Sequence, residues 1–309
     1  AATRKLRLDK DLRDVVVDGD RLLVSRFRSA ETLAVSADGV VSARHKLPEF
    51  VADGGLGSSY TPSVAWRMTA LPGGGAAMVH QRAMSTPVLI QTNAYYSMAG
   101  CDGNIVHAAI SVLQDLVDSV ELPPAAAAIP MVGLPVDIAV SRAGDRVAIV
   151  GAGNDKVVTT TPSNIESDSG LGSCFPNAQE QQVPGQPVAV AFDAEGSVVV
   201  QLREPAGIVV LGKRNIALPG DSVRDTGHDM FHRPPSEFAA MSCASCHPQG
   251  HEDGHTWDFD PIGLRRTQAI GGGILQTAPL HWDGDMSDFH DLMGEVFVSR
   301  MSGPNPGAR

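Results

Sequence analysis

The sequence predicts a multidomain protein. A small or partial all-β propeller over residues 1–220 precedes a mostly α-helical domain over residues 221–309. Short runs of β-branched residues alternate with glycine turns in the first two thirds of the chain, as is typical of antiparallel sheets. One such unit recurs at the spacing of a propeller blade. Near residue 221 the alternation stops, and seven of the ten histidines follow, which indicates a segment with different chemistry.

Composition narrows the class of protein. The chain has 309 residues, of which 43% are hydrophobic, enough for about two domains with packed cores. The formal net charge of −11 argues against a nucleic-acid partner, which requires a basic face. No apolar run reaches the roughly 18 residues of a membrane-spanning helix. Glycine at 32 and proline at 21 residues favour many short elements separated by turns.

The repeats justify the propeller. Two strand–turn–strand copies place Val136 and Val188 at matching positions, 52 residues apart, and each copy continues into another pair of strands. Units of four short strands at this spacing are typical of propeller blades. We count about four blades before residue 220, the second interrupted by an insertion around residues 84–103. An ordinary β-sandwich is the alternative, and a boundary is expected at residues 218–220.

The motif with the clearest chemistry is Cys243-Ala244-Ser245-Cys246-His247. This C-x-x-C-H spacing is the attachment signature of a c-type haem. Two thiols one helical turn apart reach the two vinyl groups of one porphyrin, and the adjacent imidazole becomes the proximal iron ligand. The second domain is therefore expected to be of the cytochrome c type, with one haem c per chain.

Other uses of the two thiols are a redox pair, half of a zinc site, or a disulfide. A redox pair belongs at a strand end in a βαβ unit, and a four-cysteine zinc site needs a second C-x-x-C. Neither is readable in this sequence. The remaining cysteines, Cys101 and Cys174, are expected to form a disulfide, because covalent haem implies an oxidising compartment. Two separate thiols are the alternative. The protein is accordingly expected to be periplasmic or secreted.

The segment from residue 226 to 304 resembles the bacterial di-haem cytochrome c peroxidase family. The matching strings are 227–231, 243–248, 253–259, 265–267 and 277–284. Residues 1–220 resemble bacterial propellers that are fused to such domains. The resemblance implies a haem protein that exchanges electrons and reduces hydrogen peroxide. The family carries two C-x-x-C-H motifs and this chain one, so the partner haem is expected beyond residue 309.

The second axial ligand is expected to be a methionine sulfur. Met301 is the first candidate, since it follows His247 by 54 residues and Arg300-Met301-Ser302-Gly303 resembles the family's ligand segment. Met293 is the second candidate, although a methionine on a helix commonly packs in a core. Histidines are the remaining alternatives. No catalytic residue is assigned.

The resemblance suggests further contacts with the haem. Arg265 or Arg266 is expected to hold a propionate, since guanidinium matches carboxylate in a bidentate way, and Arg266 fits the family's Arg-Thr pair better. His281 lies in the family's loop, beside Asp283, and is expected between haem centres. Trp257 is expected near the haem edge, with a core position as its alternative.

His251 and His255 are expected to form hydrogen bonds within a loop, with a small metal site as the weaker alternative, since a lone His-x-x-x-His pattern is a weak signal. Calcium is a weaker expectation at the turns 102–104 and 153–155, since such residues are mostly turn formers.

The front domain shows no catalytic constellation and is expected to be a docking platform. The partner is expected to be a redox protein or a second haem domain. Three functions remain open: a peroxidase-like oxidoreductase module, a single-haem electron carrier, or a ligand-binding propeller with an accessory haem.

Overall fold

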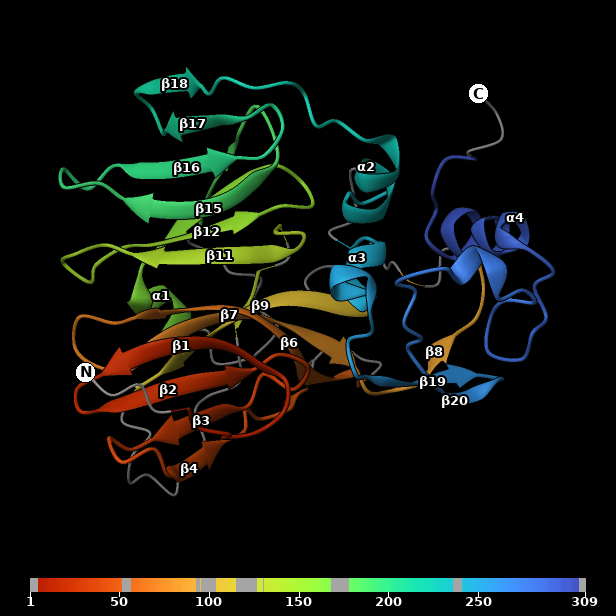
Figure 1. The fold of residues 1–309 in the computed structure, drawn as a ribbon, viewed down its shortest axis with the longest axis horizontal. Helices are drawn as coiled ribbons and strands as arrows, with labels where there is room; N and C mark the ends of the chain where they lie inside the picture. The colour runs from red at the N-terminus through yellow and green to blue at the C-terminus, as the bar shows by residue number, and fades with distance from the viewer. Residues whose placement is uncertain are drawn as a thin grey trace.

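A computed structural model describes residues 5–51, 57–92, 95, 104–114, 127–129, 131–167, 178–235 and 241–305. Within these ranges the chain forms four larger antiparallel sheets and one sheet of three strands. Figure 1 shows the four larger sheets stacked one upon another, with the small sheet and several short helices along one side.

Each larger sheet follows the order of the chain, so each is an antiparallel meander of the kind found in propeller blades. The first sheet comprises β1 (Leu12–Asp18), β2 (Arg21–Arg26), β3 (Thr32–Val35) and β4 (Val41–His45). The second comprises β5 (Phe50–Val51), β6 (Ser59–Ala70), β7 (Ala76–Met84), β9 (Val106–Leu113) and β10 (Ala127–Ala128). The third comprises β11 (Pro135–Val140), β12 (Val147–Gly151), β13 (Lys156–Thr160) and β14 (Gln179–Gln182). The fourth comprises β15 (Pro187–Phe192), β16 (Val198–Leu202), β17 (Gly207–Val210) and β18 (Arg214–Ala217).

The repeat read from the sequence is confirmed at the level of backbone geometry. Pro135 and Pro187 open the first strands of the third and fourth sheets, and in both the register shifts directly after the proline. Proline lacks the N–H of a regular ladder, so it sits at strand starts and bulges. Gly144 and Gly196 close the equivalent turns with φ of 76° and 81°, a backbone conformation that glycine adopts without strain.

Aliphatic side chains join neighbouring sheets face to face. Between the second and third sheets, Val79 and Ile110 pack in one cluster with Ile149 and Val158, all fully buried. Equivalent clusters lie between the first and second sheets and between the third and fourth. Burial of apolar surface of this kind is the main favourable contribution to folding.

The segment after residue 221 packs against the second sheet. The insertion of the second blade supplies β8 (Val88–Leu89), which pairs in parallel with β19 (Thr256–Asp260). β19 also pairs with β20 (Gly263–Arg266). The Arg28 side chain reaches Glu252 at 3.2 Å. The predicted boundary near residues 218–220 stays a prediction, while these contacts join the two parts.

The helices of the described chain are short. Outside the last segment there is α1 (Pro162–Ser167). The last segment contains α2 (Thr226–His232), α3 (Cys243–Cys246), the 3₁₀ turns η2 (Pro248–Gly250) and η3 (Ile274–Gln276), α4 (Phe289–Leu292) and the π-helix η4 (Met293–Arg300).

The predicted mostly α-helical cytochrome c-type domain is therefore wrong as a fold class. In the described part of residues 221–309 the longest helical run is formed by α4 and η4, which continue directly from Phe289 to Arg300, and two strands of this segment join a sheet. The physical reason is visible in the sequence: glycines such as Gly271, Gly272 and Gly273 interrupt it, and helix interiors disfavour glycine. The chain is mostly β and propeller-like.

Ile149→Ala should lower the free energy of unfolding by about 2–5 kcal/mol, because it leaves a cavity between two sheets. Urea unfolding followed by circular dichroism measures this change. Val17→Ala is the matched control, since Val17 is 70% exposed and its loss should change stability by less than about 0.5 kcal/mol. Equal effects of the two substitutions would contradict the packing described here.

Candidate functional site

One cavity of about 760 Å³ is walled chiefly by residues after 226, and Tyr95 and Ile105 of the second blade also line it. This volume lies within the roughly 300–1,000 Å³ typical of cofactor and small-molecule sites. Its walls are mainly apolar and aromatic. Cys243, Cys246 and His247 all lie on them, so the three motif residues face one space.

A single helical turn presents the two thiols. α3 consists of Cys243–Cys246 alone, and the Ser245 hydroxyl accepts a hydrogen bond from the Ser242 N–H at 3.1 Å. This side-chain contact satisfies a backbone donor that a helix start leaves unpaired. Both cysteines are free thiols that line the cavity.

Burial suppresses ionisation of both thiols. It raises the pKa of Cys243 to about 11. Burial also raises the pKa of Cys246 well above its usual value, and the negative charge of Asp253 adds to the effect. A redox or metal-binding cysteine usually has a lowered pKa and a thiolate at neutral pH. These thiols are protonated at neutral pH, which disfavours the redox-pair alternative.

The imidazole of His247 has a defined tautomer. Its Nδ1 lies 3.0 Å from the Gln268 carbonyl oxygen and 3.3 Å from that of His251. A carbonyl oxygen only accepts, so Nδ1 carries the hydrogen and Nε2 keeps its lone pair. Burial lowers the pKa of His247, so the ring is neutral at neutral pH. This is the arrangement of an iron-ligating histidine.

The motif turn rests on the propeller. The Gln81 side chain on β7 donates to the Ser245 carbonyl at 2.7 Å and accepts from the Trp66 indole N–H at 2.7 Å. Ala244 is 1% exposed and belongs to the cluster between the second and third sheets. The thiols therefore stand on a turn that the blade core holds.

The two candidate sulfur ligands both line the cavity. Met301 follows η4 directly, is 5% exposed, and packs in the apolar cluster that includes Trp257 and Phe259. Met293 begins η4 and is partly buried. A third methionine, Met241, also lines the cavity at 1% exposure, and the sequence pattern did not indicate it.

Aromatic rings form one wall. Trp257 stacks on Phe259 with ring centres 6.0 Å apart, and Phe259 lies 5.1 Å from Trp282. The Trp257 indole donates to the Thr267 hydroxyl at 2.9 Å. Trp257 is 2% exposed, so it is a core residue and a cavity residue at once.

Of the two ionisable residues expected at the site, His281 lines the cavity and Arg266 does not. His281 lines the cavity, and its Nδ1 contacts Asp285 at 2.7 Å, while Asp283 pairs with Arg265 at 3.0 Å. Arg266 is exposed and is not among the residues that line the cavity.

Arg300 and Tyr95 also line the cavity, and the sequence analysis identified neither of them as a site residue. For Arg300 the sequence offered one signal of a place in the site, which is its position directly before Met301.

Other expected sites have structural roles or fall outside the described residues. His255 donates through Nε2 to the Met84 carbonyl at 2.9 Å, and in the part of the chain that the structure describes no three His, Cys, Asp or Glu gather as ligands. Asn154 hydrogen-bonds the backbone at Gly133 and Met131, a turn role. Cys101, Cys174 and residues 102–103 lie outside the described residues.

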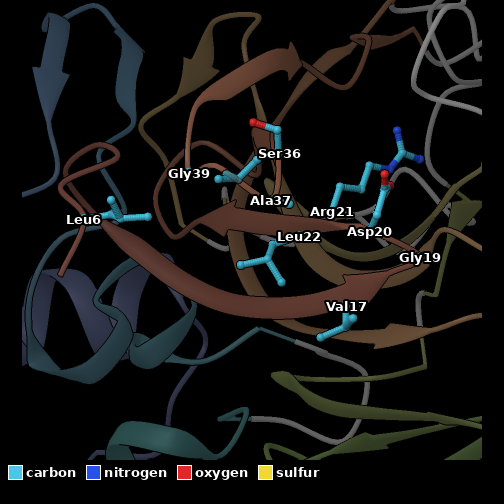
Figure 2. Close-up of a pocket in the computed structure, with 10 residues that line it drawn as sticks. Leu6, Val17, Gly19, Asp20, Arg21, Leu22, Ser36, Ala37 and Gly39 are labelled. Carbon is cyan, nitrogen blue, oxygen red and sulfur yellow. The ribbon is translucent and has the colours of Figure 1, made fainter. Parts of the chain in front are cut away.

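A second hollow, of about 290 Å³, lies on the first sheet and shares no residue with the cavity. Figure 2 shows Leu6, Val17 and Leu22 around it, with Arg21 at one end. The Arg21 guanidinium is paired with Asp18 at 2.6 Å. The hollow therefore offers mainly apolar contact and no evident chemistry.

The cavity fits a covalently attached haem. It combines two free thiols one turn apart, an imidazole with a fixed lone pair, apolar walls and a suitable volume. A haem iron takes one or two axial ligands from the protein. The lack of a larger ligand cluster among the described residues is compatible with that.

The sequence matches no protein-family model and no curated protein sequence. Three solved structures show a weak structural likeness. Hydrazine synthase from Kuenenia stuttgartiensis has a TM-score of 0.45 and 14% identity, covering 66% of this chain and 57% of that chain. Virginiamycin B lyase from Staphylococcus aureus has a TM-score of 0.38 and 11% identity, and the match covers 69% of this chain and 57% of that chain. The β-propeller domain of Myceliophteria thermophila Cps50 (Swd1) has a TM-score of 0.36 and 11% identity, and the match covers 62% of this chain and 50% of that chain.

The chain thus spans about half to three fifths of the length of these structures. The resemblance of residues 226–304 to the di-haem cytochrome c peroxidase family is wrong, since the mostly helical domain that it implies is not present among the described residues.

Among the described residues, no helix is both long and apolar enough to cross a membrane.

In reduced protein prepared without haem, alkylation of Cys243 by iodoacetamide should be slow at neutral pH and should rise as the pH approaches 11. The raised pKa keeps the thiol protonated below that pH, and the thiolate is the nucleophile. Mass spectrometry of timed samples measures the rate. The control is the chain unfolded in guanidinium, where a thiol has a pKa of about 8.5. Equal rates at neutral pH in folded and unfolded protein would exclude the buried environment.

Proposed function

We propose that this protein binds one haem c covalently through Cys243 and Cys246, with His247 as the proximal iron ligand, and that it exchanges electrons through this group. The observation that carries the proposal is that both thiols and the imidazole lie on the wall of one cavity of cofactor size. Neither half of this observation is enough alone, because a C-x-x-C-H string is short and a cavity is common.

Each of the chain's residues has a defined task in this proposal. The two thiols anchor the group, and the α3 turn sets their spacing. The carbonyls of Gln268 and His251 hold Nδ1–H of His247, which orients the ring and makes Nε2 a better ligand. The bound haem supplies a one-electron couple at its iron. The apolar wall of Trp257 and Phe259 excludes water and so favours the less charged, reduced state.

A second protein ligand distinguishes an electron-transfer site from one that binds small molecules. Met301 is our first choice, and Met293 is the second. Both line the cavity, and a thioether ligand raises the reduction potential. The packing of Met301 in the apolar cluster is the competing explanation for its burial.

Location and partners follow from the proposed cofactor. Haem is attached to thiols where disulfides are permitted, so we place the protein in the periplasm or outside the cell. We assign it a redox protein or a second haem domain as partner, with the propeller as the docking platform. An acidic surface, with a net charge of −11, favours a basic redox partner.

The test is expression with a haem-attachment system, followed by a pyridine haemochrome assay and intact mass. The expected result is one haem per chain, retained under denaturing conditions. Cys243→Ala/Cys246→Ala should abolish covalent retention, and His247→Ala should turn the spectrum high-spin. His290→Ala is the control, because His290 is exposed and does not line the cavity.

The second ligand is read from the same sample. Loss of the red charge-transfer band of His–Met iron in Met301→Ala, with the band kept in Met293→Ala, would identify Met301. Wild-type protein that carries no haem under these conditions would contradict the whole proposal.

A further inference from the structure

Two buried side chains on the cavity wall have polar atoms without a hydrogen-bond partner among the described residues. These atoms are Nη1 of Arg300 and Nε2 of His281. Each side chain is 7% exposed, and both residues line the cavity. Buried polar atoms are nearly always paired in folded proteins, so unpaired ones are candidates for contacts with a ligand.

Arg300 is suited to an anion. It ends η4, its carbonyl accepts from the Tyr95 N–H at 3.4 Å, and its guanidinium donates to the Tyr95 hydroxyl. A guanidinium has five N–H donors and no acceptor, and it stays charged. A buried N–H donor that has no acceptor is costly. The missing partner of Nη1 must therefore be an acceptor, and a carboxylate matches it best.

His281 is held in an unusual backbone conformation. Its φ is 71°, a left-handed value that costs a non-glycine residue about 1–2 kcal/mol. The backbone bridge between Leu280 and Met286 closes this loop. Residues kept in such strained conformations are concentrated at functional sites.

Asp285 connects the two side chains electrostatically. Its carboxylate accepts from Nδ1 of His281, and the positive charge of Arg300 acts on the same carboxylate. These are the charged groups around His281 for which the described residues record an interaction. Arg300 and His281 therefore share one acidic neighbour.

We propose that Arg300 and His281 form a carboxylate subsite in the cavity wall, and that its ligand is a haem propionate. The inference rests on the proposed function, since the haem brings the carboxylate. On binding, His281 takes a proton from solvent onto Nε2 and donates it in a hydrogen bond, while Nδ1–H stays on Asp285. Arg266, expected in this role from the sequence, is exposed away from the cavity lining.

The test compares Arg300→Gln with Arg265→Gln in the haem-loaded protein. Arg265→Gln is the control, because it removes the same charge from a residue that does not line the cavity and that pairs with Asp283. Resonance Raman spectra report the propionate bending modes, and spectroelectrochemistry reports the reduction potential between pH 5 and pH 9.

Arg300→Gln should shift the propionate modes and lower the potential, because a positive charge near the iron favours the reduced state. The potential should also become more dependent on pH, since a carboxylate that loses its cation has a higher pKa. His281→Gln should shift the same modes, with His290→Gln as its control. Arg265→Gln and His290→Gln should leave modes and profile unchanged.

Arg300→Lys is the second variant should Arg300→Gln fail to fold. It keeps the charge and loses the forked geometry, so it should shift the Raman modes with a small change in potential. Unchanged modes and an unchanged potential–pH profile in a variant that retains its haem would overturn the subsite and leave the proposed function standing. Wild-type protein without haem would overturn both.

Discussion

The hydrogen bond from Gln81 to the Ser245 carbonyl sets the position of everything else at the site. It fixes a four-residue turn, which is too short to hold its own shape, on a strand of the second blade. The same side chain also accepts from Trp66, so replacing it would leave a buried donor and a buried acceptor unpaired at once. Through this contact the rigid propeller core defines the direction of both thiols.

The insertion of the second blade gives the last segment a second attachment. β8 pairs with β19, and β19 brings Trp257 and Phe259 to the cavity wall. An isolated pair of strands is only marginally stable in water, and a third strand or a packed face stabilises it. The blade therefore supplies what the glycine-rich segment lacks, and a cavity forms without the long helices that normally build one.

Burial affects the ionisable groups of this cavity in two different ways. Burial keeps the thiols protonated and His247 neutral, which lowers the cost of placing them in an apolar wall. Arg300 cannot lose its charge in the same way. Arg300 is buried and interacts with Tyr95 and Asp285. The free energy of keeping its charge in the cavity wall therefore depends directly on what fills the cavity.

The local pattern of the sequence determined the blades, the glycine turns and the C-x-x-C-H turn, because each depends on residues close together in the chain. Alternation and turn chemistry placed β11 and β15 at equivalent positions, and the C-x-x-C-H spacing alone indicated the haem chemistry. The helical fold expected for the last segment came from family likeness and was wrong, while the role of Arg266 stays a prediction. Only the tertiary structure brought Arg300, Tyr95 and Met241 to one cavity, because their separation in sequence hides contacts that packing against the second blade creates.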